Sequence, residues 1–523
     1  MPLLHQKKPG HTRKARNSDP SRFINEIMDS CRLRMKVYLN AFILVFACSL
    51  FLAEFLEAKT TTPNNLNGRI QLVLKNPSLK NVSYGISVVS VKKNTVLFNY
   101  RDNDLFSIAS NMKLLTTAAA LEYLGPDFQY KTSIETRGKI TTQGELEGDV
   151  IIRGSGDPNL SGRFYSSNIT AVPESWADAI RNRGIHEISG DIIADDRVFD
   201  RVYTNPGWPE NQLSEWYCAP SCGLSFNDNC VDITLLPCKK PGDIVTLRVE
   251  PDTAYFTILN TCVSTSNKKE HAYSIYRKPG TNQIFIKGKF WVNASPEKSW
   301  VNVHSPALYL ATVFKEALEK KGVTVGGNAR IIDEADALDA DLEKITETIS
   351  TMKETVLVTN KNSQNFYAEQ IVKTLGAQIK GRGSLDAGIE VLHAFMDKLG
   401  FSPDAYQIQD GSGLSKGNKL SPGMITTLLT YMNRHPHRDV LYDSLPVSGI
   451  DGGLRRRMAS SQYKSKVHAK TGYIAKTSAL SGYIDTSNGD TLAFSILMNN
   501  FKDLGAVRKI QDDICQALVN WYN

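Results

Sequence analysis

The sequence has few cysteines, little net charge and none of the short motifs that mark several common enzyme classes. Its 523 residues include eight cysteines, and no two of them form a C-x-x-C pair. Zinc-ribbon and thioredoxin-type functions therefore lose their main sequence support. The pattern H-E-x-x-H and the Walker loop are also absent, which argues against the enzyme classes that they mark. We predict neither a metal site nor a cofactor.

The cysteines leave two interpretations open. Five of them fall between Cys218 and Cys262, and eight are too few for a disulfide scaffold in a chain of this length. In an oxidising compartment some could pair, with a connectivity that sequence does not give. The alternative is that they are small, buried, apolar thiols.

Composition predicts a globular protein. Hydrophobic residues make up 41% of the chain and charged residues 22%, which excludes wholesale disorder. At roughly 150 residues per domain, the length predicts two to four domains, or one large domain with insertions.

The start of the chain carries a topology signal. Residues 37–56 form an apolar run, VYLNAFILVFACSLFLAEFL, and about 20 helical residues span the ~30 Å core of a bilayer. Positive charge on the amino side keeps that side cytoplasmic. We predict a cytoplasmic segment at 1–36, a signal anchor or signal peptide at 37–56, and a linker at 57–68. The basic residues of the first segment are Lys7, Lys8, Arg13, Lys14, Arg16, Arg22, Arg32, Arg34 and Lys36.

This topology places the rest of the chain in the cell envelope, with the membrane as a partner of the N-terminal segment. It also explains the formal net charge of +7. Residues 1–36 hold nine basic and three acidic residues, whereas residues 37–523 hold 52 basic and 51 acidic residues. The charge of the folded part gives nucleic-acid binding no support, so we predict no nucleic-acid partner.

The remaining pattern predicts an α/β domain at 69–125 plus 346–523, interrupted by a large β-rich insert at 126–345. The domain combines strands of β-rich composition with apolar helices, and Ser110 suits the start of the first helix as a cap. The insert is rich in short strands and turns. The expected elements are a hairpin at 84–91 and 95–100, a helix at 110–124, strands at 479–484 and 491–498, and a helix at about 503–522.

Ser110 and Lys113 form the first candidate for chemistry. They are three residues apart on a predicted helix, so their side chains share one face. A serine hydroxyl becomes a good nucleophile when a neighbouring base takes its proton, and a lysine does so once desolvation or nearby positive charge has lowered its pKa. On its own the pair is weak evidence for catalysis, since a helix cap beside a surface lysine has the same spacing.

Two further elements follow in order along the chain. Ser363-Gln364-Asn365 matches S-x-N, and Lys470-Thr471-Gly472 matches K-T-G. The set S-x-x-K, S-x-N and K-T-G marks the serine acyl-transfer site of penicillin-binding proteins and class A β-lactamases. Each element is common by chance, but the ordered set in matching context is not.

Longer strings make the resemblance specific. Over about residues 70–520 the chain resembles the D-alanyl-D-alanine carboxypeptidase/endopeptidase family, the class C low-molecular-mass penicillin-binding proteins. The 253 positions from Ser110 to Ser363 also match the large insert of that family. The matching strings are Ser107–Leu115, Gly154–Pro158, Asp195–Asp200, Tyr217–Pro220, Leu224–Asn227, Asn365–Glu369, Asp410–Ser415 and Pro446–Arg455.

The resemblance implies a serine DD-peptidase fold, an antiparallel sheet flanked by helices, and a set of catalytic roles. Ser110 attacks the carbonyl between two D-alanines of a peptidoglycan stem peptide, and Lys113 is the general base. Ser363 and Lys470 relay a proton to the leaving amine, while Asn365 holds the substrate amide. β-Lactam antibiotics acylate the same serine as covalent inhibitors.

It also implies a set of substrate contacts. Thr471 and Lys470 meet the terminal carboxylate. Gly472 completes K-T-G, and the backbone N–H groups of Ser110 and Tyr473 form the oxyanion hole.

Two positions depart from the family pattern. Gln364 stands where Asp is usual, and Tyr473 stands where Thr often binds the carboxylate. The balance between carboxypeptidase and endopeptidase activity therefore stays open. The alternatives are a non-catalytic penicillin- or peptidoglycan-binding sensor, and a β-lactamase-like hydrolase or esterase, which the large insert disfavours.

Three other features receive structural interpretations. Asp410-Gly-Ser-Gly413 is expected to be a turn. Arg455-Arg-Arg457 could bind a phosphate, but a solvated face or internal ion pairs are favoured. His468 is expected to have no catalytic role.

Overall fold

The computed structural model describes residues 64–333, 336 and 342–521. The chain divides into two compact units, Met1–Asn65 and Leu66–Asn523. The predicted cytoplasmic segment at 1–36 and the predicted membrane segment at 37–56 lie outside the described residues. Within the described ranges, no helix is both long and apolar enough to cross a membrane.

The last part of the expected linker is helical. Helix α2 (Asn64–Leu74) begins inside the 57–68 segment. Leu66 and Ile70, one turn apart on the same face, are buried in one hydrophobic cluster with residues of the C-terminal helix α11 (Leu504–Val519). Packing of that face explains why a segment of linker composition forms a helix here.

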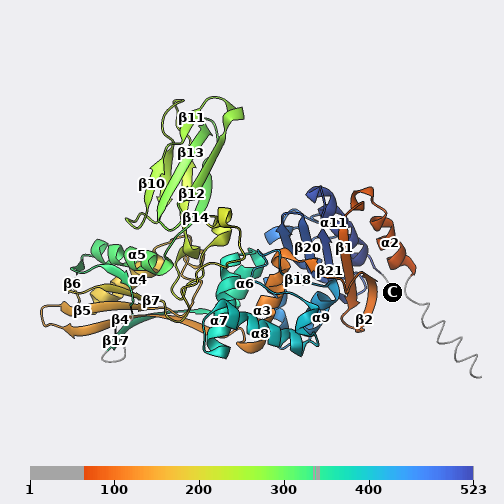
Figure 1. Cartoon of the computed structure of the whole chain (residues 1–523), viewed down its shortest axis with the longest axis horizontal. Helices are drawn as coiled ribbons and strands as arrows, with labels where there is room; N and C mark the ends of the chain where they lie inside the picture. Colours follow the sequence, from red (N-terminus) through yellow and green to blue (C-terminus); the bar gives the residue numbers. More distant parts are fainter. Residues whose placement is uncertain (1–63, 334–335, 337–341, 522–523) are drawn as a thin grey trace, which may run out of the picture. The chain divides into compact units, whose positions relative to one another are not determined.

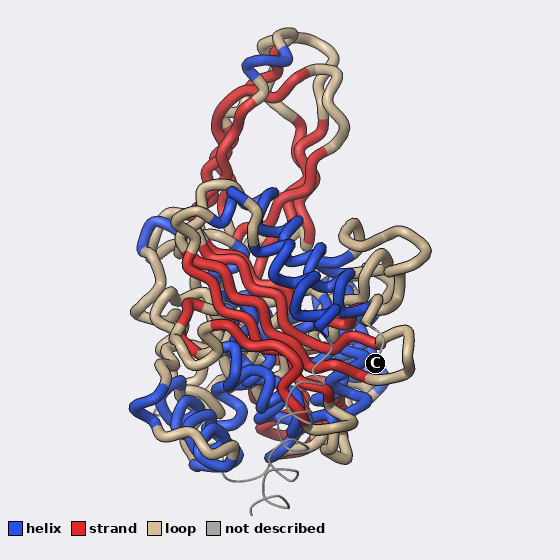
Figure 2. The backbone as a smooth tube through the Cα atoms, turned by 90° about the vertical axis from the view of Figure 1, so that its right-hand side faces the viewer, coloured by secondary structure: helices blue, strands red, loops and turns tan. Residues whose placement is uncertain are grey.

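The motif-bearing part of the chain is built on a five-stranded antiparallel sheet in the order β19-β20-β21-β1-β2. The predicted hairpin is confirmed as β1 and β2, and the two predicted C-terminal strands are the neighbours β20 and β21. Figure 2 shows these strands side by side. Their bounds are β1 Ser83–Ser90, β2 Thr95–Tyr100, β19 Val467–Ile474, β20 Thr477–Asp485 and β21 Thr491–Asn499.

Both faces of this sheet are buried. Side chains alternate between faces along a strand, and in β20 the pair Ala479 and Tyr483 joins one hydrophobic cluster while Leu480 and Ile484 join another. The first cluster lies among the helices of the motif-bearing face, and the second includes residues of α11. Burial on both faces explains why the strands are almost continuously apolar.

The helices of the first cluster surround α3 (Met112–Tyr123). α3 contacts α6, α7, α8 and α9, and Figure 1 shows α3 among α6, α7 and α8. A short ladder of β3 (Phe106–Ser107) with β18 (Lys419–Leu420) precedes it. The remaining bounds are α6 Met352–Lys361, α7 Asn365–Lys380, α8 Leu385–Lys398, α9 Pro422–Asn433 and α10 Arg438–Ser444.

The predicted cap role of Ser110 is wrong. Ser110 lies in a 3-10 turn, Ala109–Asn111, and Asn111 takes the cap position of α3 without a side-chain hydrogen bond. The Ser110 hydroxyl is instead near the Lys113 amine, one turn along.

Residues between α3 and α6 form three further sheets and two α-helices, so the segment expected to be β-rich also contains α-helices. The first strand, β4, pairs antiparallel with the last, β17, with Gln129 opposite Thr351. The chain thus leaves and re-enters the motif-bearing part at one place. The main bounds are β4 Gln129–Ile140, β5 Glu145–Arg153, α4 Ala171–Asn182, β6 Glu187–Ile188, β7 Ile192–Asp195, β8 Cys230–Leu236, β9 Thr246–Glu250, β10 Thr257–Asn260, β11 Val263–Thr265, β12 Ala272–Arg277, β13 Gln283–Trp291, β14 Glu297–Asn302, α5 Pro306–Lys320, β15 Thr324–Val325, β16 Ala329–Ile331 and β17 Leu342–Thr351.

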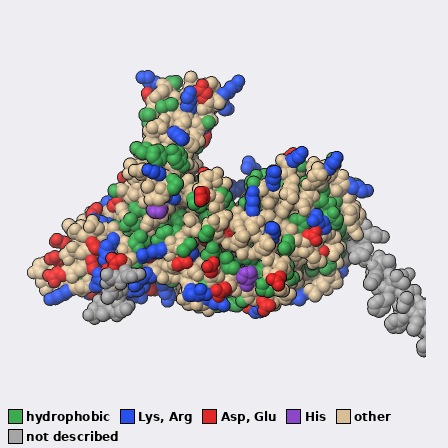
Figure 3. Space-filling view, viewed as in Figure 1, with side chains coloured by type: hydrophobic (Ala, Val, Ile, Leu, Met, Phe, Trp, Pro, Cys, Tyr) green, Lys and Arg blue, Asp and Glu red, His purple; other side chains and the backbone are tan. Residues whose placement is uncertain are grey.

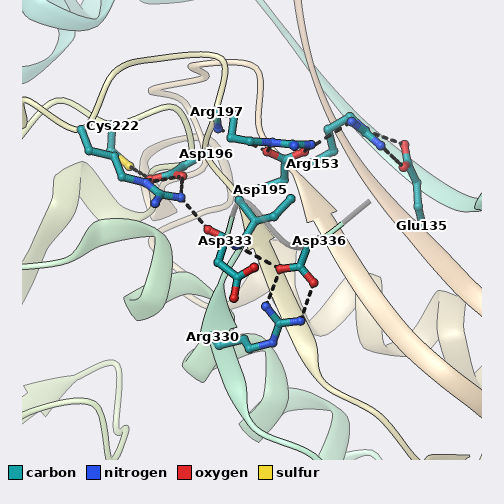
Figure 4. A network of polar contacts seen from close by, with 11 residues as sticks. Glu135, Arg153, Asp195, Asp196, Arg197, Cys222, Arg330, Asp333 and Asp336 are labelled. Carbon is teal, nitrogen blue, oxygen red and sulfur yellow. Dashed lines mark hydrogen bonds and ion pairs between the residues drawn. The ribbon is translucent and has the colours of Figure 1, made fainter. Parts of the chain in front are cut away.

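A network of ion pairs links the strands of this segment (Figure 4). Arg153 of β5 lies 3.0 Å from Glu135 of β4 and 3.3 Å from Asp195 of β7. Arg330 of β16 contacts Asp336 at 2.6 Å. Asp195, at the start of the matching string Asp195–Asp200, therefore has a structural role. Figure 3 shows acidic and basic side chains interspersed over the face that carries β4 and β5.

The described cysteines are free thiols, which favours the second of the two interpretations. No disulfide joins any of them within the part of the chain that the structure describes. Burial raises the pKa of the Cys222 thiol to about 12, which keeps it in the neutral, unreactive form. The buried thiols are Cys218, Cys222, Cys230, Cys262 and Cys515, and Cys238 is half-buried.

Candidate active site

The three sequence motifs meet in space. Lys113 Nζ lies 3.1 Å from Ser110 Oγ and 2.7 Å from Asn365 Oδ1. Lys470 Nζ, on β19, lies 2.8 Å from Ser363 Oγ. Two serine–lysine pairs from distant parts of the sequence, one with members 3 positions apart and one with members 107 positions apart, thus lie in one site.

Lys113 has the surroundings of a neutral amine. Its side chain is fully buried, and the burial lowers the pKa of Lys113 to about 7, although the carboxylates of Asp410 and Glu369 act in the opposite direction. A neutral amine has two N–H donors and one lone pair. The donors match Asn365 Oδ1 and the Ser412 carbonyl oxygen at 2.6 Å, which leaves the lone pair for the Ser110 hydroxyl.

Lys470 is also fully buried. Burial and the nearby charge of Lys113 hold the pKa of Lys470 well below its ordinary value. Its amine contacts Ser363 Oγ and, at 2.8 Å, the Thr471 carbonyl oxygen. Ser363 has a φ of 57°, in the left-handed region where a non-glycine residue is uncommon, so the loop holds this hydroxyl at some conformational cost.

Sequence reasoning missed the loop that forms one wall of the Lys113 site. The Asp410 carboxylate accepts hydrogen bonds from the backbone N–H groups of Gly413 and Ser415, both at 2.6 Å. This closed turn, expected at 410–413, aims the Ser412 carbonyl at Lys113. The matching string Asp410–Ser415 was the sequence signal for this loop. Spacing alone does not show that its Ser412 carbonyl oxygen faces Lys113.

Glu369 is a second residue that sequence reasoning left without a role. It lies on α7, one turn after Asn365, and accepts the Ser412 N–H at 2.9 Å. Burial and the nearby Asp410 raise the pKa of Glu369 to about 8. It therefore supports the loop while adding little negative charge beside Lys113 near neutral pH.

A close approach of β19 to the nucleophile turn requires Gly472. A Cβ added at Gly472 would lie 2.8 Å from the Ile108 carbonyl oxygen and 3.1 Å from the Ser110 nitrogen. The Asn111 side chain also donates a hydrogen bond of 3.1 Å to the Lys470 carbonyl. The strand edge and the Ser110 backbone N–H are therefore side by side, as an oxyanion hole from Ser110 and Tyr473 requires.

Thr471 and Tyr473 point to the other face of β19, because side chains alternate along a strand. Thr471 Oγ1 packs against Gly453, where an added Cβ would lie 2.4 Å away. Tyr473 is 51% exposed, and the guanidinium of Arg508 on α11 lies 5.6 Å from its ring centre. The residue that replaces the usual Thr thus brings an arginine beside K-T-G.

The segment between α3 and α6 fixes the start of α7. Asn365 donates a hydrogen bond of 2.9 Å to the Tyr217 carbonyl, and Gln364 donates one of 2.8 Å to Asp228. Two turns further on, the buried Lys373 pairs with Asp200 at 2.7 Å. Gln364 therefore contacts the neighbouring segment and leaves the Ser110–Lys113 pair untouched.

The remaining candidates do not join this site. The His468 ring stacks on Tyr442 with centres 4.2 Å apart, and burial lowers the pKa of His468. No group of three or more His, Cys, Asp or Glu side chains within residues 64–333, 336 and 342–521 is arranged to hold a metal ion.

A buried serine–lysine pair beside K-T-G, on an antiparallel sheet flanked by helices, defines a serine-type acyl-transfer hydrolase. Comparisons with known proteins narrow this class. Residues 66–521 match the model of the D-Ala-D-Ala carboxypeptidase 3 (S13) family. The protein belongs to this family, and the resemblance predicted from its motifs is confirmed.

Several relatives are similar over most of their length. A D-alanyl-D-alanine carboxypeptidase of Actinomadura sp. (strain R39) is 30% identical over 477 residues, which cover 89% of this chain and 86% of the relative. A penicillin-sensitive carboxypeptidase A of Dictyostelium discoideum is 27% identical, with 78% and 80% covered. The crystal structure of penicillin binding protein 4 from Haemophilus influenzae shares the fold, with a TM-score of 0.74, 22% identity, and 87% of this chain and all of that chain covered.

The buried amine predicts a pH profile. Acylation by a β-lactam should require neutral Lys113, so its second-order rate constant should rise with pH through about 7 and level off above. Labelled penicillin and stopped-time gels between about pH 5.5 and 9 measure it. Thermal unfolding at each pH separates titration of the base from loss of the fold. A rate that is flat or falls across neutral pH contradicts the assignment.

The close approach at Gly472 predicts a loss of activity without a loss of fold. Gly472→Ala should push β19 away from the Ser110 turn and lower the acylation rate by about 100-fold, the cost of a misplacement near 1 Å. Gly68→Ala is the matched control, because an added Cβ there meets no atom within 4 Å. Equal rates for the two variants would show that the strand edge is not part of the site.

Proposed function

We propose that this serine peptidase hydrolyses the D-Ala-D-Ala bond of peptidoglycan stem peptides, or the corresponding cross-link, through an acyl-enzyme on Ser110. The observation that carries the proposal is the geometry of Lys113, whose amine lies 3.1 Å from Ser110 Oγ with its two N–H groups already matched. A base held in this way takes the hydroxyl proton as Oγ attacks the carbonyl carbon. General base catalysis of this kind raises the reaction rate by about 10²–10⁴-fold.

The second pair serves the leaving group. Ser363 and Lys470 relay a proton to the amine nitrogen as the C–N bond breaks, and the 2.8 Å contact between them supports this route. Water then attacks the ester carbon, the Ser110 oxygen recovers its proton, and the shortened peptide leaves. Both lysines start and finish the cycle uncharged, which their burial favours.

The substrate lies along β19. The N–H groups of Ser110 and Tyr473 hold the developing oxyanion, each worth about 10²–10³-fold. The Asn365 amide has a second N–H for a substrate carbonyl, since it donates only one to Tyr217. Thr471, with Lys470 beside it, meets the carboxylate at the end of the peptide, and Gly472 allows the close fit.

β-Lactams act as covalent inhibitors by the same acylation. Relatives named for penicillin sensitivity and penicillin binding support this proposal. The sensor alternative rested on Gln364, Tyr473 and the predicted membrane anchor. Gln364 bonds to Asp228, and the polar groups of the site are complete, so catalysis is the better supported function.

We also propose the organisation of the chain. A catalytic domain at 69–125 plus 346–523 carries an insert at 126–345, which the pairing of β4 with β17 supports. The protein acts in the cell envelope, and the finer expectation is export through the segment at 37–56, with 1–36 left in the cytoplasm. The purpose of the insert includes support of α7.

Removing the nucleophile tests the proposal. Ser110→Ala in the full-length protein should abolish both covalent labelling by penicillin and release of D-alanine from a stem-peptide mimic. Ser460→Ala, an exposed serine in a turn, is the control and should keep both. Labelling of the Ser110 variant would mean that another residue is the nucleophile. Labelling without peptide turnover by the wild type would favour the sensor function.

A further inference from the structure

A cleft of about 750 Å³ lies on the face of β19 that carries Thr471 and Tyr473. We call it the arginine cleft. None of the described residues that line it is acidic. They are Asn362, Gly452, Gly453, Arg455, Arg456, Arg457, Thr471 and Arg508.

Most of the positive charge of the arginine cleft is uncompensated. Arg457 is paired with Asp512 at 2.8 Å and also bonds to Gln511. Arg455, Arg456 and Arg508 are exposed and form no ion pair with a carboxylate in the part of the chain that the structure describes. Of the two interpretations favoured for 455–457, internal ion pairs fit Arg457, and a solvated face fits Arg455 and Arg456.

The arginine cleft shares residues with the catalytic site. Thr471 belongs to K-T-G, and Asn362 directly precedes Ser363. Tyr473, on the same face as Thr471, holds the guanidinium of Arg508 over its ring at 5.6 Å, a favourable cation–π contact. Tyr473 therefore contacts the positive charge that Arg508 of α11 brings to this face.

The location of the arginine cleft indicates which part of the substrate it faces. Under the proposed function, on which this inference rests, Thr471 and Lys470 meet the carboxylate next to the cleaved bond, on the leaving-group side. A leaving group that is larger than D-alanine extends past this carboxylate and reaches the arginines. Guanidinium groups bind carboxylates well, because their N–H groups match the two oxygens.

We propose that Arg455, Arg456 and Arg508 form an anion-binding subsite that selects leaving groups carrying a second carboxylate. Its ligand class is a peptide amine with an acidic group beyond the one beside the cleaved bond, as the acceptor strand of a cross-link provides. The reaction is unchanged: water supplies OH to the acyl carbon, and the leaving nitrogen takes the proton. Tyr473 is a positioning residue for Arg508.

The test compares two substrates of equal shape. The full-length protein is given acylated D-Ala-D-Glu and D-Ala-D-Gln, whose leaving groups differ by one carboxylate, with D-Ala-D-Ala as the reference. Exposed ion pairs are modest, so we expect kcat/KM for the D-Glu peptide to exceed that for D-Gln by about three- to tenfold at low salt. The preference should fall in about 0.5 M NaCl, where the screening length is a few ångströms.

Variants assign the preference to the subsite. Arg455→Gln, Arg456→Gln and Arg508→Gln should each reduce the D-Glu/D-Gln ratio, and the triple variant should bring it to about one. Tyr473→Phe should keep the ratio and Tyr473→Ala should lower it, because the ring holds Arg508. Arg434→Gln, an exposed arginine bonded to Asn94, is the matched charge control.

The outcomes separate this inference from the proposed function. If the wild type hydrolyses D-Ala-D-Ala but its D-Glu/D-Gln ratio is near one, the proposed subsite is wrong and the proposed peptidase function is retained. A ratio that survives in the triple variant also overturns it. If no substrate is cleaved and Ser110 is not labelled by penicillin, the proposed function fails first. Should a variant fold poorly, the salt dependence of the wild-type ratio decides.

Discussion

The complete burial of the Lys113 amine is the constraint on which the rest of the site depends. Under the proposed mechanism Lys113 takes a proton from Ser110 and must first be neutral, and burial favours the neutral form by lowering the pKa of Lys113 to about 7. A buried amine is tolerated only where its donors are matched. Asn365 and the Ser412 carbonyl provide that match, so the start of α7 and the loop after α8 complete the surroundings of this amine.

Negative charge near this amine has to be controlled. Asp410 and Glu369 both lie close enough to raise the pKa of Lys113, which would weaken it as a base at neutral pH. Asp410 is instead surrounded by N–H donors, including the indole of Trp208 at 3.1 Å. Glu369 avoids ionising, since burial and Asp410 raise its pKa to about 8. The Asp410 carboxylate is thus held by hydrogen bonds, and Glu369 is favoured in its protonated form.

The sequence predicted the strands and the motif residues of the site better than the tertiary contacts that surround them. Hydrophobic runs gave the hairpin and the strands β20 and β21, because period and length are local properties. Motif order brought Ser110, Ser363 and Lys470 together. The cap assigned to Ser110 was wrong, since a serine before an apolar helix fits either role. The contacts of Asn365 with Tyr217, across 148 positions, depend on tertiary folding that no local pattern encodes.

Charge shows the same division between bulk and local properties. Residues 37–523 carry nearly equal numbers of basic and acidic residues, 52 and 51, and that balance gives no reason to expect a nucleic-acid partner. It says nothing about where charges gather, because the field at a site is set by groups within about a screening length. Two buried lysines with lowered pKa values and three exposed arginines lie on opposite faces of β19. One strand thereby separates two amines whose burial favours the neutral form from three guanidinium groups that keep their charge in contact with solvent.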